Sequence, residues 1–149
     1  MDSNATYYGL GIDAGGTQTR WALADVSGMI IADGQVAGLT GLQMLTESGR
    51  KHIQEVFTEL AAQVHGYGRP ARVTAGLTGL GDDNENLRAI LADALGVINS
   101  SVTLGSDVEI AYQDVYAPGE GYLVYAGTGS IAAFIDDAGD LHRAGGHGV

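Results

Sequence analysis

The sequence has no cysteine among its 149 residues, which excludes disulfides, thiolate metal sites and thiol nucleophiles within this chain. Cations are scarce as well: seven Lys and Arg residues stand against 18 Asp and Glu, and the formal net charge is -11. Nucleic acids and anionic membrane surfaces bind proteins through clustered cations. We therefore expect neither a nucleic acid nor a membrane as a partner.

A long apolar run is also missing. No stretch approaches the roughly 20 apolar residues of a membrane span. The N-terminal residues, MDSNATYYGLG, lack the basic segment and apolar core of a signal peptide. We therefore expect a soluble, cytoplasmic protein, and its 45% hydrophobic content suffices for a domain with a packed core.

The spacing of apolar residues predicts an α/β fold. Short or alternating apolar runs predict strands at 7–13, 19–25, 29–36, 72–78, 101–105, 122–126, 131–136 and 140–143. Helical spacing predicts helices at about 44–64, 84–95 and 107–117. The order is a three-stranded meander followed by alternating helices and strands, which indicates a mixed sheet, and then a new hairpin.

A turn of glycine and hydroxyl residues between two apolar runs occurs twice, at Gly15 to Thr17 and at Gly127 to Ser130. The second turn lies near the end of the chain, which stops at AGGHGV without a helix cap or another stop signal. We expect a first domain over residues 1–117 and the opening hairpin of a second domain over 118–149. On this interpretation the chain is truncated.

Three phosphate-binding geometries compete for the first turn. The P-loop requires a lysine after its last glycine, and the only lysine is Lys51, in a predicted helix. Residues 9–14 match the dinucleotide fingerprint formally, but a strand follows them instead of the required helix. A hairpin turn whose amides and hydroxyls bind phosphate, with Asp13 placed to hold Mg²⁺, fits best. A plain hairpin turn is the alternative at this point.

Five stretches carry a resemblance to a known family: GIDAGGTQTRWALAD (11–25), AGLTGLGDD (75–83), SVTLGSDVEIAY (101–112), YAGTGSIAAF (125–134) and AGGHGV (144–149). They resemble, in the same order, the BadF/BadG/BcrA/BcrD-type ATPase family, which includes N-acetylglucosamine kinase and glucosamine kinase. The resemblance implies a ribonuclease H-like, actin-like ATPase fold and an ATP-dependent sugar kinase. It also implies ATP and Mg²⁺ as cofactors and a small sugar as substrate, and it leaves a homodimer open.

The family's binding residues fall on definite positions of this sequence. Asp13 matches the Mg²⁺ anchor. The family's adenine-binding pattern would lie beyond Val149, so we expect the chain alone to be inactive. The phosphate-binding positions are Gly15, Gly16, Thr17 and Thr19 at the first turn and Gly127, Thr128, Gly129 and Ser130 at the second.

Asp107 matches the family's catalytic aspartate at a helix start, where it would take the proton of the attacking sugar hydroxyl. An aspartate at a helix start is also a common N-cap, and the two roles are compatible. On the substrate side the resemblance implies Gly79 beside the sugar. Amino-sugar kinases of the family usually carry an asparagine after the third strand, whereas residues 37–42 contain none, and Thr40 would donate instead.

Two other functions stay open. The family also contains ATPases that activate electron-transfer enzymes, whose paired subunits hold an iron–sulfur cluster through cysteines, and this chain has none. The third interpretation is a sugar-sensing module without turnover.

Overall fold

The structure is a computed structural model, and it describes residues 6–81, 84–106, 109–110, 113–114, 117–120, 123–126 and 130–145. The chain divides into two compact units, Met1–Ser106 and Asp107–Val149. Each unit is described by itself below. Within the described residues, no helix is both long enough and apolar enough to span a bilayer.

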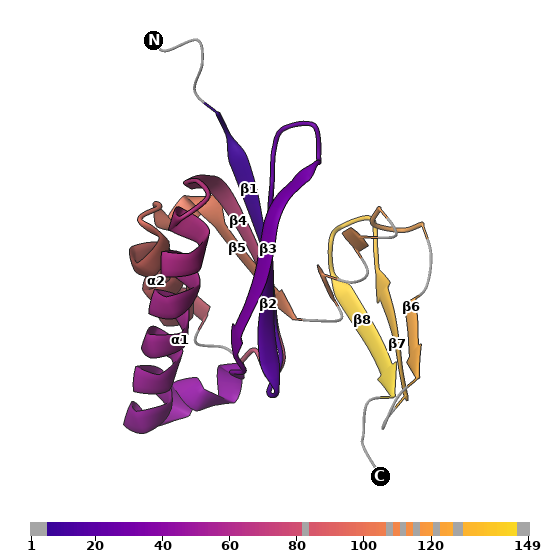
Figure 1. Cartoon of the computed structure of the whole chain (residues 1–149). Coiled ribbons are helices and arrows are strands. Elements are labelled where there is room, and N and C mark those ends of the chain that lie inside the picture. Colours follow the sequence, from indigo (N-terminus) through magenta and orange to yellow (C-terminus); the bar gives the residue numbers. More distant parts are fainter. Residues whose placement is uncertain are drawn as a thin grey trace. The chain divides into compact units, whose positions relative to one another are not determined.

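The first unit is built on a five-stranded mixed sheet with the order β3-β2-β1-β4-β5 (Figure 1). The first three strands form an antiparallel meander, and β1, β4 and β5 run parallel. This arrangement confirms the predicted α/β fold with its initial meander. The strands are β1 (Tyr8–Ala14), β2 (Gln18–Ala24), β3 (Ile30–Ala37), β4 (Pro70–Leu77) and β5 (Val102–Ser106).

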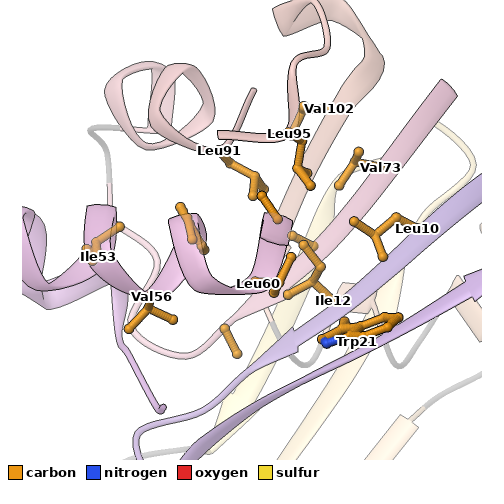
Figure 2. Packing of buried hydrophobic residues seen from close by; sticks show 14 of the residues in the cluster. Leu10, Ile12, Trp21, Ile53, Val56, Leu60, Val73, Leu91, Leu95 and Val102 are labelled. Atoms are coloured by element: carbon orange, nitrogen blue, oxygen red, sulfur yellow. The ribbon is translucent and has the colours of Figure 1, made fainter. Parts of the chain in front are cut away.

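Two helices, α1 (Glu47–His65) and α2 (Asn84–Leu95), cover the same face of this sheet (Figure 1). In β1 alternate residues turn toward them, so Leu10, Ile12 and Ala14 are buried while Gly9, Gly11 and Asp13 are exposed on the other face. Figure 2 shows the core that results, in which strand residues such as Leu10 and Val73 meet helix residues such as Leu60 and Leu91.

Helix α1 begins at Glu47, a few residues later than the apolar spacing predicts. A 3-10 turn, η1 (Gly41–Leu45), comes first and buries Met44. Thr46 then caps α1, since its Oγ1 accepts a hydrogen bond from the Gly49 N–H at 3.0 Å. A second 3-10 turn, η2 (Asn99–Ser101), precedes β5.

The second unit contains an antiparallel sheet with the order β6-β7-β8, made of β6 (Leu123–Ala126), β7 (Ser130–Ile135) and β8 (Leu141–Gly145). Its first two strands correspond to the hairpin predicted at 122–126 and 131–136, and β8 corresponds to the strand predicted at 140–143. Of the helix expected over 107–117, the structure describes residues 109, 110, 113 and 114 as helical, and residue 117 without regular structure.

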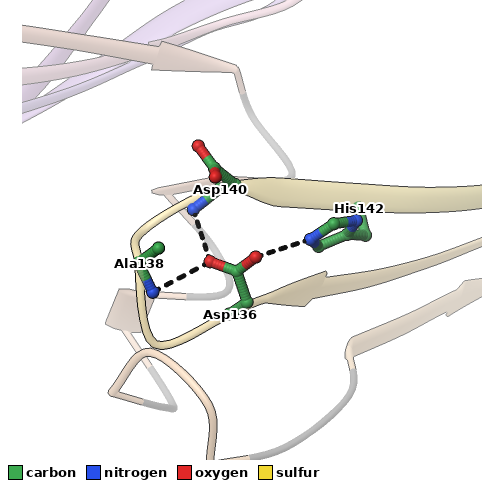
Figure 3. A network of polar contacts seen from close by, with 4 residues as sticks. All are labelled: Asp136, Ala138, Asp140 and His142. Carbon is green, nitrogen blue, oxygen red and sulfur yellow. Dashed lines mark hydrogen bonds and ion pairs between the residues drawn. The ribbon is translucent and has the colours of Figure 1, made fainter.

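Asp136 holds the turn between β7 and β8 (Figure 3). Its Oδ1 accepts from the N–H groups of Ala138 and Asp140 at 3.0 and 2.9 Å, and its Oδ2 accepts from His142 Nε2 at 2.8 Å. The bond from His142, followed by that from Asp140, lowers the pKa of Asp136 below its usual value of 3.8.

Candidate functional site

Three loops of the first unit meet at one edge of its sheet, where the parallel strands end. Ala14 of β1 pairs with Leu77 of β4, which pairs with Ser106 of β5. Backbone hydrogen bonds join the loops that follow β1, β3 and β4: the Leu39 N–H donates to Gly15 O (3.0 Å), the Gly41 N–H donates to Thr78 O (2.8 Å), and the Thr78 N–H donates to Ala14 O at the end of β1 (3.1 Å). In open α/β sheets this edge is the usual place of a ligand site.

The β1–β2 turn presents free amide groups at this edge. The Gly15 N–H donates to the Gln18 carbonyl at 3.1 Å, and the Gly15 carbonyl accepts from Leu39. Gly16 and Thr17 are exposed, and within the described part of the chain their N–H groups have no hydrogen-bond partner. Neighbouring free N–H groups of this kind can bind an anion such as a phosphate.

The two glycines of the turn are not required by the fold. Neither Gly15 nor Gly16 has a positive φ, so the backbone conformation of the turn does not require glycine at either position. A Cβ on Gly15 would lie 3.5 Å from the Gln18 carbonyl oxygen, and one on Gly16 would lie 3.6 Å from Thr40 Cγ2. Both are ordinary contacts, so what glycine provides at this turn is an uncovered backbone.

Asp13 is exposed on the sheet face that the helices do not cover. Arg20 is its partner in the β1–β2 register, but the Arg20 guanidinium donates to the side-chain oxygen of Gln18, with Nη2 at 2.6 Å and Nε at 2.8 Å. Among the described residues the Asp13 carboxylate has neither a hydrogen bond nor an ion pair. Proteins hold hydrated Mg²⁺ through one or two carboxylates and substrate phosphates, and an exposed, unpaired carboxylate that closely precedes a turn with free amide groups fits this pattern.

Thr19, in β2, lies on the opposite face of the sheet from Asp13. It is 0% exposed, and its hydroxyl is enclosed without a partner in the described structure. Strand parity is the reason: Thr19 points to the core together with Trp21 and Leu23, whereas Arg20 shares a face with Asp13. Its side chain therefore does not line the exposed surface of the turn, and we leave Thr19 out of the proposed site.

Thr40 lies beside the turn, and Gly79 lies beside Gly41, the residue that follows Thr40. The Thr40 N–H donates to Gln43 Oε1 at 2.9 Å, and its methyl group faces Gly16. Gly79 has a φ of +70°, which favours glycine, and its carbonyl lies against the Cα of Gly41. The structure thus places Thr40 against the predicted phosphate turn and Gly79 against Gly41, the residue after Thr40.

The rest of the predicted site lies mostly outside the described residues. Asp107 directly follows Ser106, the last residue of β5, but is not itself described. The same holds for Gly127, Thr128 and Gly129, while Ser130 begins β7 and pairs with Ala126. Among the residues that the structure describes, no three or more His, Asp or Glu side chains form a group that could hold a metal ion.

The fold is that of actin-like ATPases and sugar kinases. No family model and no curated protein matches the sequence. A proposed N-acetylglucosamine kinase from Chromobacterium violaceum is 26% identical and covers 95% of this chain, with a TM-score of 0.63. A glucokinase from Balamuthia mandrillaris, solved with glucose, is 16% identical over 97% of the chain, with a TM-score of 0.60. A ROK family glucokinase from Streptomyces griseus, solved with glucose and AMPPNP, is 20% identical over 94%, with a TM-score of 0.57.

The chain spans about half the length of these three proteins, since it covers 50%, 49% and 47% of them. The similarity supports a sugar kinase-like fold. At 16% and 20% identity, the likeness to the two glucokinases shows the fold alone.

Proposed function

We propose that this chain is part of an ATP-dependent sugar kinase that transfers the γ-phosphoryl group to a hydroxyl of an amino sugar of the N-acetylglucosamine or glucosamine type. The observation that carries the proposal is the β1–β2 turn, which has two free backbone amides, at Gly16 and Thr17, and follows the exposed, unpaired carboxylate of Asp13 closely in the chain. The 26% identity to a proposed N-acetylglucosamine kinase supports the choice of substrate class.

The turn would supply binding and charge neutralisation. The N–H groups of Gly16 and Thr17 would donate to phosphate oxygens, and Asp13 would hold Mg²⁺ through its carboxylate. Mg²⁺, when bound, neutralises part of the phosphate charge. Phosphoryl transfer needs positioning and electrostatic stabilisation more than covalent chemistry, so such a site suits it.

The remaining roles follow the resemblance. Asp107 would accept the proton of the sugar hydroxyl as its oxygen attacks phosphorus. Thr40 and Gly79 would lie on the sugar side of the site. In the second unit, the predicted phosphate ligands are Gly127, Thr128, Gly129 and Ser130.

The test is ATP consumption by the complete natural protein, with Mg²⁺ and a panel of hexoses and amino sugars, alongside Asp107→Asn. We expect turnover that depends on an amino sugar and falls by about 100-fold or more in the variant, the scale of a lost general base. ATP hydrolysis that needs no sugar and is unchanged in the variant would overturn the proposal and favour an ATPase acting on a partner protein.

A further inference from the structure

We propose that His52 of α1 is a positioning residue, which sets the orientation of the phosphate-binding turn through Gly38. This inference rests on the proposed function, because it assigns a role to the same turn. The His52 ring lies part-buried, with Nε2 2.8 Å from the carbonyl oxygen of Gly38. A carbonyl oxygen only accepts, so Nε2 carries the proton and donates it.

Gly38 lies directly against the turn. A Cβ on Gly38 would stand 2.5 Å from the Gly16 carbonyl carbon and 2.7 Å from the Gly15 carbonyl oxygen. The next residue, Leu39, donates its N–H to the Gly15 carbonyl at 3.0 Å, and its side chain is buried in the core at 1% exposure. A displacement of Gly38 is therefore transmitted to the peptide groups of the turn.

These contacts decide where the free amides of the turn point. The Gly15 carbonyl and the Gly16 N–H belong to one planar peptide group and point in opposite directions. Because Leu39 holds the Gly15 carbonyl, the Gly16 N–H is directed away from Leu39. The Gly16 carbonyl lies against Gly38, and the Thr17 N–H, which shares its peptide group, is likewise directed away.

The chain offers a matched control at the other end of the same helix. His65 Nε2 makes the same type of bond, to the carbonyl of Leu95 at 3.1 Å, and is also part-buried. The bond of His65 joins α1 to the end of α2, whereas that of His52 joins it to the segment over the turn. If His52 had a merely structural role, removal of either ring would affect the turn amides and the Mg-ADP affinity equally.

The experiment uses the complete natural protein and compares His52→Ala, His52→Gln and His65→Ala by backbone amide NMR shifts, thermal melting and equilibrium binding of Mg-ADP. We expect His52→Ala to shift the amide resonances of Gly16 and Thr17 and to weaken Mg-ADP binding about 10-fold, the scale of one hydrogen bond. His52→Gln, which keeps a donor, should recover most of the affinity. His65→Ala should lower the melting temperature while the turn resonances and the affinity stay unchanged.

The two proposals fail in different ways. Turn resonances that stay in place in His52→Ala, or that move equally in His65→Ala, overturn the positioning role. Absence of Mg-ADP binding by the complete wild-type protein overturns the proposed function, and the amide shifts still decide the role of His52.

Discussion

Gly38 packs against the peptide group of Gly16 so closely that no side chain fits between them, because a Cβ on Gly38 would lie 2.5 Å from the Gly16 carbonyl carbon. Gly16 itself has room for a Cβ, which would lie 3.6 Å from the nearest atom, Thr40 Cγ2. The two glycines thus serve different purposes. Gly38 allows the loops to pack, and Gly16 leaves the backbone of the turn uncovered.

This difference predicts opposite effects of alanine. Gly38→Ala should destabilise the protein by about 1–3 kcal/mol, as overpacked sites do. Gly16→Ala should leave the free energy of unfolding unchanged or raise it by a few tenths of a kcal/mol, since its φ is not positive. It should nevertheless weaken Mg-ADP binding. Denaturant unfolding and calorimetric binding of both variants check this, and a loss of stability in Gly16→Ala without loss of binding would contradict it.

Gly79→Ala should destabilise the protein by about 1–2 kcal/mol, the cost of a left-handed conformation for a residue with a Cβ. The φ of Gly79 is +70°, and its Cβ would lie 3.1 Å from Leu42 Cγ. Gly81→Ala is the control, because that glycine lacks a positive φ and has no atom within 4 Å of an added Cβ. Equal unfolding midpoints for the two variants would show that the loop after β4 rearranges freely.

Strands β1 and β2 could be predicted because buried residues alternate with more exposed ones along both. Helix α2 has the predicted bounds of 84–95, since its apolar spacing begins and ends with the helix. The burial of Thr19 could not be predicted from its nearness to the turn, because it follows from the register that pairs Thr19 with Ala14 and turns its side chain toward the core. His52 left no signal either: its partner is a backbone carbonyl, and every residue has one.

Asp13→Asn should abolish the contribution of Mg²⁺ to nucleotide binding and leave the stability unchanged, because the carboxylate is exposed and unpaired in the described structure. The measurement is ADP affinity with Mg²⁺ and with EDTA. Asp33→Asn, which removes an exposed carboxylate from β3, serves as the control. The assignment of Asp13 fails if both variants keep the Mg²⁺ dependence of the wild type.

The hydrogen bonds of Asp136 predict that the stability of the second unit depends on pH. Its pKa is lowered by the bonds from His142 and from the turn amides, so the bound form is the carboxylate. The stability it contributes is present above the unfolded pKa of about 4 and is lost as the pH falls through the lower folded pKa. An NMR titration of the Asp136 carboxyl group should give a midpoint below 3.8. A midpoint at or above that value would contradict the network drawn in Figure 3.

The central claim is that the exposed amides of Gly16 and Thr17 bind nucleotide phosphate. The most direct measurement is a titration of the ¹⁵N-labelled complete protein with Mg-AMPPNP, followed at the backbone amide resonances. The account predicts that the Gly16 and Thr17 resonances move to lower field and saturate together, as amides do when they donate to an anion, and that Gly16→Ala weakens the effect. Saturable binding that leaves both resonances in place, or no binding at all, would contradict it.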